Sequence, residues 1–178
     1  MKAWAPTLQR LQKGFTIIEL LVVIVIIGVI ATIIIVGYSS VASSANDTSI
    51  KDDLTKVSDA FKLFKLDNGS FPDTEAELAT TGVKVSSQSY ATTTKANLYI
   101  CVNADSSEFA AIAMSKSTKR FVVKSESGLS DYTGTVVWDA STGNWSTTCS
   151  SINSSYVPLT GNVTGMVDGS WATWVRAQ

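Results

Sequence analysis

A run of 22 predominantly apolar residues, 15–36, constrains this chain more than any other feature. At about 1.5 Å per residue a helix of this length spans roughly 33 Å, which is enough to cross a bilayer. The run contains no proline and a single charged residue, Glu19. Ionisable side chains inside a membrane are costly and usually functional, so this lone carboxylate needs a specific explanation.

The flanking residues predict the orientation of this helix. Residues 1–14 carry Lys2, Arg10 and Lys13 and no acidic residue. Positive flanks stay in the cytoplasm, so the C-terminal bulk of the chain is expected on the outer side. A secretory signal has a shorter apolar core, of about 7–15 residues, although the small residues 43–45 offer a weak cleavage site. An ordinary single-span anchor would show the same hydropathy without the Gly-Phe junction and Glu19.

The residues at the start of the run resemble those of the type IV pilin and pseudopilin family. Residues 13–19 read Lys-Gly-Phe-Thr-Ile-Ile-Glu, and the similarity extends to Ala31. The resemblance implies that residues 1–14 are a prepilin leader. It further implies that a prepilin peptidase cleaves between Gly14 and Phe15 and N-methylates Phe15. Members of the family often carry a proline midway along this helix, and this chain has none there.

Cleavage at that junction would give Glu19 an electrostatic partner. A new α-amino group at Phe15 is cationic at neutral pH. At 4 Å and an effective dielectric constant of about 20, its attraction to Glu19 approaches 4 kcal/mol before desolvation is subtracted. Glu19 could neutralise the Phe15 amine of a neighbouring subunit and so set the stagger of a filament. It could equally pair with the amine of its own chain, four residues away on one helical face.

Residues 37–66 are predicted to continue the same helix as an amphipathic segment. Apolar side chains recur at spacings of three and four, which is the pattern of a core-facing helical stripe, at Ile50, Leu54, Val57, Phe61 and Phe64. The result is one helix of about 50 residues, with a bend or melted turn conceivable in the small, polar residues 37–44. Asn68-Gly69 and Pro72 should end it.

Residues 67–149 are predicted to form an extracytoplasmic β-sheet domain that packs on the exposed half of the helix. A short helix is expected near residues 72–80, with Asp73 as its cap. Segments rich in β-branched and aromatic residues then suggest an antiparallel meander of strands at residues 98–102, 108–114, 119–124, 134–139 and 144–148. Residues 141–144 are typical of a hairpin turn. The predicted fold class is α+β, which the pilin resemblance also implies.

Two cysteines, Cys101 and Cys149, are expected to be paired, because their domain lies outside the membrane. A C-terminal disulfide loop is familiar in type IV pilins and less usual in major pseudopilins. Residues 150–178 form a polar tail with several aromatic residues. We expect at least residues 171–175 to dock on the domain or on a neighbour, against the alternative of a loosely ordered terminus.

The composition offers little for catalysis or cofactor chemistry. The chain has no histidine, and its cysteines are expected to be oxidised, so we predict no catalytic residue, no cofactor and no metal. Asp73, Glu75 and Glu77 are read as solvated charge at a helix start rather than a Ca²⁺ site. Loss of the leader leaves 11 basic against 15 acidic side chains. A DNA-binding patch could involve only the cations Lys116, Lys119, Arg120 and Lys124.

These observations predict a structural filament subunit rather than an enzyme. Its implied partners are further copies of itself in a helical homopolymer, the prepilin peptidase, a platform protein, an assembly ATPase and, before assembly, inner-membrane lipid. The expected location is the cytoplasmic membrane and then an extracellular pilus, with adhesion, twitching motility or DNA uptake as implied roles. The alternatives are a pseudopilin of a type II secretion or competence system, and a single-span binding protein that does not polymerise.

Overall fold

The computed structural model describes residues 14–91, 97–136, 145–159, 166–167, 170–172 and 175–177. The chain divides into two compact units, residues 1–40 and 41–178. The predicted leader residues 1–13 and the hairpin turn at 141–144 lie outside the described residues.

Helix α1, Ile17–Asn68, runs through 52 residues without interruption. This confirms the prediction of one helix of about 50 residues, and residues 37–44 are helical as well. No proline interrupts the segment, so every interior backbone N–H can reach a carbonyl one turn earlier. Gly69, at a φ of 85°, turns the chain away and donates its N–H to the Lys65 carbonyl at 2.8 Å. Glycine suits this left-handed position because it has no Cβ.

The main sheet has five antiparallel strands in the order β5-β4-β3-β2-β6. Its members are β2 (Leu98–Asn103), β3 (Phe109–Met114), β4 (Arg120–Lys124), β5 (Gly128–Asp131) and β6 (Tyr156–Pro158). Strands β2 to β5 form an antiparallel meander, of which β2, β3 and β4 lie at predicted positions, and β6 returns to pair with β2. Pro158 is the last residue of β6, at an edge of the sheet, where a strand tolerates a residue without an N–H.

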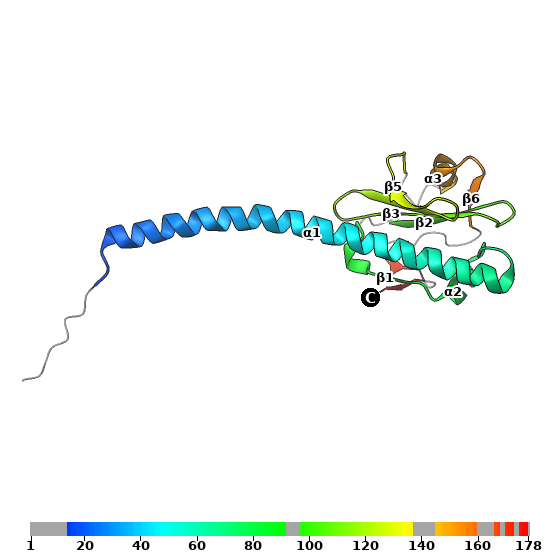
Figure 1. Cartoon of the computed structure of the whole chain (residues 1–178), viewed down its shortest axis with the longest axis horizontal. Coiled ribbons are helices and arrows are strands. Elements are labelled where there is room, and N and C mark those ends of the chain that lie inside the picture. Colours follow the sequence, from blue (N-terminus) through cyan, green and yellow to red (C-terminus); the bar gives the residue numbers. More distant parts are fainter. Residues whose placement is uncertain are drawn as a thin grey trace, which may run out of the picture. The chain divides into compact units, whose positions relative to one another are not determined.

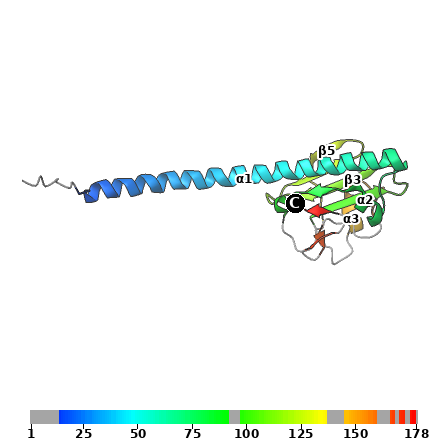
Figure 2. The ribbon, with the colours of Figure 1, turned by 90° about the horizontal axis from the view of Figure 1, so that it is seen from below.

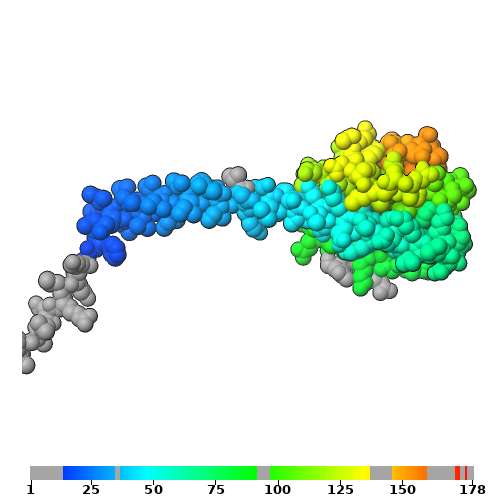
Figure 3. All heavy atoms as spheres, viewed as in Figure 1, coloured from blue at the N-terminus to red at the C-terminus, as the bar shows by residue number. Residues whose placement is uncertain are grey.

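One face of this sheet packs on the second half of α1. Ile50, Leu54, Val57 and Phe61 are fully buried, as the sequence pattern predicts. They meet the strand residues that alternate towards them, which are Leu98, Ile100, Val102, Phe109, Ala111, Ala113, Phe121 and Val123. Phe109 contacts the rings of both Phe61 and Phe71, with centroids 5.0 and 4.7 Å away. The outer surface of this part of α1 is visible in Figure 3 as cyan and green spheres.

A second layer covers the opposite face of the sheet. Helix α3, Trp145–Ile152, lies on the side away from α1 (Figure 1). Cys149 is buried and forms a disulfide with Cys101 of β2, with their Cα atoms 5.5 Å apart. The predicted pairing is therefore confirmed. The strands between the two layers have almost no exposed residues, because side chains on both faces are covered.

The strand predicted at residues 144–148 is wrong, because residues 145–148 lie in α3, and residue 144 is outside the described part. Its threonines and tryptophan resemble a strand in composition. However, Thr148, Cys149 and Ile152 fall on one face of a helix, and all three pack towards the sheet. Burial of that face against β2, together with the disulfide, outweighs the weak β-propensity of the segment.

Two further local predictions differ from the structure. The fourth strand of the meander is β5 at Gly128–Asp131, whereas residues 134–136 form no strand and residues 137–139 lie outside the described part. Helix α2, Glu75–Thr81, is capped by Thr74, whose side chain accepts from the N–H of Glu77, and not by Asp73. The Glu77 carboxylate in turn accepts from the N–H of Asp73 at 2.9 Å. This reciprocal arrangement makes Thr74 the better cap.

The C-terminal segment docks on the domain, as expected for its aromatic and apolar residues. Trp171 stacks edge-on against Tyr90, with ring centroids 5.2 Å apart, and Ala172 and Val175 are buried. Strand β9 (Arg176–Ala177) pairs in parallel with β1 (Lys84–Val85), and these two strands lie side by side in Figure 2. Residues 173 and 174 lie outside the described part.

A buried carboxylate ties α1 to the segment that follows α2. Asp53 has no exposed surface and accepts a hydrogen bond from the Ser86 N–H at 2.6 Å. Lys56 lies 3.5 Å from it on the next helical turn. Burial raises the pKa of Asp53 above its usual value, and the Ser86 bond and Lys56 offset this only in part. Burial, and secondly the charge of Asp53, also raise the pKa of Tyr90.

We predict that loss of the disulfide destabilises the domain without changing its architecture. Cys101 and Cys149 are 48 residues apart, and closing such a loop stabilises a fold by roughly 4 kcal/mol in the chain-entropy model. Cys101→Ala combined with Cys149→Ala should lower the free energy of unfolding by about 2–4 kcal/mol, measured by urea titration of the detergent-solubilised chain. Wild-type protein reduced with dithiothreitol is the matched control. Equal stability of oxidised and reduced protein would contradict the prediction.

We also predict that Asp53 makes the wild-type domain less stable as the pH rises. Because the pKa of Asp53 is higher in the folded state than in the unfolded chain, the folded state binds more protons between the two values. Wild-type protein should therefore lose stability relative to Asp53→Asn as the pH rises above about 4, the ordinary pKa of an aspartate, until Asp53 is ionised in the folded state as well. Urea titrations of both proteins at several pH values provide the measurement. A stability difference that does not change with pH, or changes with the opposite sign, would contradict it.

Candidate functional site

The junction between Gly14 and Phe15 lies on exposed, non-helical backbone. Helix α1 begins at Ile17, so residues 14–16 precede it. A Cβ placed on Gly14 would have no neighbour within 4 Å, and 91% of Phe15 is exposed. Exposed backbone outside secondary structure is the preferred substrate of proteases. The junction is therefore accessible for the predicted cleavage.

Glu19 and Thr16 form a reciprocal cap at the start of α1. The Glu19 carboxylate accepts from the Thr16 N–H and from the Thr16 hydroxyl, both at 2.8 Å. The Thr16 Oγ1 accepts from the Glu19 N–H at 3.2 Å. Each residue thus satisfies a backbone donor that the first helical turn leaves without a partner. Such caps contribute about 1 kcal/mol to helix stability, and a carboxylate also suits the positive end of the helix dipole.

This cap was not predicted, although the sequence contains its signature. Thr16-Ile17-Ile18-Glu19 is a Thr-x-x-Glu pattern directly before an apolar run. The prediction for Glu19 concerned a Phe15 amine, which exists only once the leader is removed. In the intact chain Glu19 instead bonds to the residue next to Phe15. Both Glu19 bonds use one carboxylate oxygen, Oε2, and among the described residues the other oxygen accepts no hydrogen bond.

The segment that follows the cap exposes apolar side chains all round. Large exposed residues continue from Ile17, 84% exposed, to Val41, 68% exposed. Helix α1 has a mean hydropathy of 3.4 over its most apolar 18 residues, and none of that window is buried. The Thr32 hydroxyl donates to the carbonyls of Gly28 and Val29, so it adds no unsatisfied donor to this surface. By length and composition the helix is able to cross a membrane.

The other residues considered for binding are held in local structural contacts. Asp73 accepts from the Ser106 hydroxyl at 2.8 Å, and Glu77 caps the backbone before α2. Within the described ranges no three of the His, Cys, Asp and Glu side chains gather as metal ligands would. The structure therefore gives no support for a metal site at Asp73, Glu75 and Glu77, which lie at the start of the short helix α2.

The basic residues proposed for DNA contact do not form one patch. Lys119 pairs with Asp47 of α1 at 3.1 Å, and Arg120 donates to the Gly134 carbonyl at 2.8 Å. Lys124 lies at the opposite end of β4. Burial disfavours the charge of Asp47, but hydrogen bonds from Ser117 and Ser115 and the ammonium of Lys119 outweigh it and lower the Asp47 pKa.

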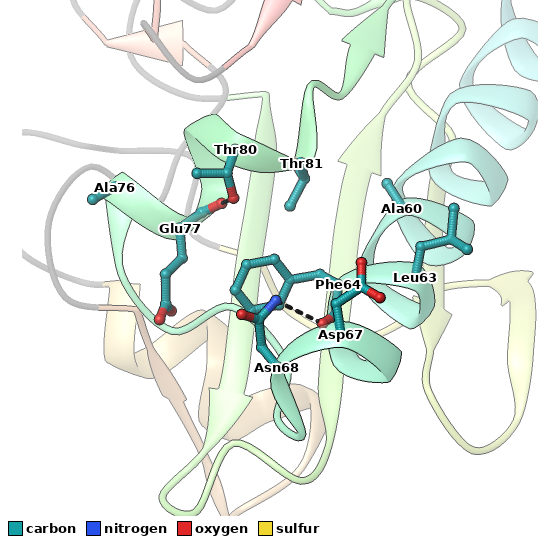
Figure 4. Close-up of a pocket in the computed structure, with 9 residues that line it drawn as sticks. All are labelled: Ala60, Leu63, Phe64, Asp67, Asn68, Ala76, Glu77, Thr80 and Thr81. Atoms are coloured by element: carbon teal, nitrogen blue, oxygen red, sulfur yellow. Dashed lines mark hydrogen bonds between the residues drawn. The ribbon is translucent and has the colours of Figure 1, made fainter.

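An open groove lies between the C-terminal end of α1 and helix α2. It has a volume of about 660 Å³ and is lined by apolar groups of Ala60, Leu63, Phe64 and Ala76 together with the carboxylates of Asp67 and Glu77. Figure 4 shows the α1 and α2 side chains on its two sides. Leu63 is 63% exposed and contributes apolar surface to the groove. We call this surface the α1–α2 groove.

Comparison with known proteins identifies the N-terminal motif. Residues 9–35 match the family described as the prokaryotic N-terminal methylation motif. The type II secretion system core protein G of Pseudomonas aeruginosa is 37% identical over 70 residues, 39% of this chain and 49% of that protein. The type IV wide pilus major component PilA4 of Thermus thermophilus is 36% identical over 76 residues, 43% of this chain and 58% of that protein.

A further relative, the core protein G of Escherichia coli K12, is 36% identical over 67 residues, which are 38% of this chain and 46% of that protein. The chain thus matches about half the length of these curated relatives. The motif covers the leader junction, the Thr16–Glu19 cap and the exposed apolar segment. Together with the α+β architecture of a long N-terminal helix packed on an antiparallel sheet, these matches support the resemblance of the chain to the type IV pilin and pseudopilin family.

Proposed function

We propose that this chain is a structural subunit that polymerises into a filament through the N-terminal part of α1. The observation that carries the proposal is the exposed apolar surface between residues 17 and 41, which begins with a capped, accessible processing junction. Such a surface is stable in lipid, but in water it must be covered. Bundling with the same segment of other copies would cover it without any further partner.

Processing would prepare Glu19 for this change of surroundings. A charged side chain at the centre of a membrane costs about 2.5–3.5 kcal/mol on insertion scales. Cleavage after Gly14 would place a cationic amine on Phe15, one residue before the cap that already holds Glu19 near the helix start. We propose that this amine, N-methylated, pairs with the Glu19 carboxylate of a neighbouring copy. Neutralising both charges would lower the cost of burying them in an apolar bundle.

Two forms of filament are consistent with this chemistry. The relatives named as type II secretion core proteins favour a pseudopilus, a short fibre of a secretion or competence apparatus. The similarity to PilA4 and the disulfide between Cys101 and Cys149 favour a surface pilus, with adhesion, twitching motility or DNA uptake as its roles. In both forms the subunit acts mechanically and catalyses no reaction. Its expected partners are the prepilin peptidase, a platform protein, an assembly ATPase and further copies of itself.

Removal of residues 1–14 tests whether the chain is a filament subunit. The location of the processed chain then distinguishes a surface pilus from a pseudopilus. We expect the chain isolated from its cells to lack residues 1–14 and to begin with N-methyl-Phe15, as measured by intact-mass spectrometry. Recovery in sheared surface filaments would indicate a pilus, and recovery in membranes alone a pseudopilus. A chain that retains residues 1–14 would contradict the proposal and favour a single-span anchored binding protein.

Substitution of Glu19 separates its charge from its capping role. Glu19→Gln keeps an oxygen that can accept from the Thr16 N–H, because glutamine also serves in this capping arrangement. Loss of the charge should nevertheless reduce the filament yield by about tenfold or more, since a tenfold change corresponds to only ~1.4 kcal/mol. The leader should still be cleaved, which intact mass would verify.

Thr16→Val is the matched control for this variant. It removes the hydroxyl of the cap, worth about 1 kcal/mol, but leaves the Glu19 charge in place. Filament yield should therefore fall less for Thr16→Val than for Glu19→Gln, as measured by sedimentation of sheared material. A Glu19→Gln chain that assembles like wild type would show that the charge is not needed.

A further inference from the structure

We propose that the α1–α2 groove receives the turn between β3 and β4 of a second copy of this chain. This inference rests on the proposed filament and names the contact between its globular domains. The β3–β4 turn comprises residues 115–119, and it would place the ammonium of Lys116 between the carboxylates of Asp67 and Glu77. The argument depends on the position, charge and rigidity of these two surfaces.

The two surfaces lie at opposite ends of the domain. The turn is fixed to the start of the packed part of α1, because Ser117 and Lys119 both bond to Asp47. The groove lies at the other end of the same helix, around Ala60 to Asn68. At 1.5 Å per residue, the helix rises about 30 Å between Asp47 and Asp67. The groove therefore cannot be filled by the turn of its own chain.

The charges of the two surfaces are complementary. Residues 66–81 contain four carboxylates and no lysine or arginine, whereas residues 115–120 contain three cations and no carboxylate. Asp67 and Glu77 both line the groove. Lys119 and Arg120 are engaged within their own domain, but the described residues offer no ion-pair partner to the exposed Lys116. Lys116 is thus the cation of the turn that is available to another molecule.

The groove also suits the rest of a lysine side chain. Its wall includes exposed apolar surface on Leu63 and half-buried surface on Phe64. A lysine buries its aliphatic stem on apolar groups while its ammonium reaches polar ones. In Figure 4 the side chains of Asp67 and Glu77 come from opposite walls, one from each helix, with the Phe64 ring between them. An ammonium group that enters over this ring would be attracted by both carboxylates.

The turn is rigid before any contact is made. Its backbone is held by bonds from Ser115 N–H to the Lys119 carbonyl, from Thr118 N–H to the Ser115 carbonyl and from Lys116 N–H to the Ser89 carbonyl, at 2.8–3.0 Å. Thr118 has a φ of 71°, which a residue with a branched side chain adopts only when its surroundings enforce it. Such a preorganised turn loses little entropy on docking.

Contacts between two different surfaces have a specific consequence for assembly. A copy that binds head to tail leaves its own groove and its own turn free at the two ends of the pair. Heterologous interfaces of this kind extend into open helical polymers when the rotation between copies does not close a ring. A groove at one end of the domain and a complementary turn at the other end therefore suit a filament. In a symmetric dimer each surface would instead face the same surface of the partner.

Cross-linking in assembled filaments tests the contact directly. The full-length double variant Lys116→Cys, Asp67→Cys would be treated with a short bismaleimide, since residues that meet through a lysine side chain are farther apart than a disulfide spans. Asp67 is chosen because it is exposed, whereas Glu77 also holds the Asp73 N–H before α2. The two native cysteines are bonded and cannot react. We expect a ladder of dimers and larger species for the double variant and monomer alone for each single variant. Filaments without a ladder, or a dimer from one single variant, would overturn the proposed contact.

Charge exchange gives an independent measurement. Like charges placed opposite each other oppose association, so Lys116→Glu should lower the filament yield by about tenfold. Combining Lys116→Glu with Asp67→Lys should restore most of that loss. Lys62→Glu is the matched control, because Lys62 is exposed, lines neither surface and gives the same change in net charge. Equal yields for Lys116→Glu and Lys62→Glu would overturn the contact.

These experiments also distinguish failure of the contact from failure of the proposed function. Wild-type chains that are processed but never form filaments would overturn the filament role itself. Wild-type filaments in which neither the cross-link nor the charge exchange behaves as expected would overturn only the contact between the groove and the turn.

Discussion

The structure depends on one constraint, which is that a single helix must be stable in two different surroundings. From Ile17 to Ile34, α1 exposes large apolar side chains on all sides. From Ile50 onwards only one face is apolar, and that face is buried against the sheet. The change in pattern divides the chain into its two units. An all-round apolar surface selects lipid or other helices, whereas a one-sided stripe selects a sheet as its partner.

Much of the fold could be predicted because its signals are local and periodic. The length of α1, its buried stripe and its end at Asn68 follow from spacing and from the Asn-Gly pair, and three central strands follow from continuous apolar runs. The composition of α3 favours a strand, whereas the spacing of its buried residues fits a helix. Burial against the sheet stabilises the helix, and this tertiary contact is not visible in the sequence. Strand β5 has one large apolar residue and β6 is only three residues long, so neither shows a sequence pattern and pairing with β4 and β2 determines them.

The functional residues likewise divide into those that the sequence predicts and those that only the structure shows. Gly14, Phe15 and Glu19 were found by resemblance, and the structure adds that Thr16 holds Glu19 at the start of the helix. Sequence alone contains the Thr-x-x-Glu pattern, but only geometry shows that both residues make the reciprocal bonds. The α1–α2 groove could not be predicted at all. Its two walls come from separate helices, and its shape depends on how Gly69 and Gly82 turn the chain between and after them.

The disulfide between Cys101 and Cys149 has a further consequence for a fibre that carries load. Tension in the proposed filament would enter each domain through α1 and then pass to the sheet, in which β2 pairs with both β3 and β6. Without the bond, the chain from Cys101 to Cys149, a sequence separation of 48 residues, could pull out to about 160 Å when fully extended. With the bond in place this length is not available to a stretching force. The covalent link therefore limits how far a loaded subunit can extend, whatever it contributes to equilibrium stability.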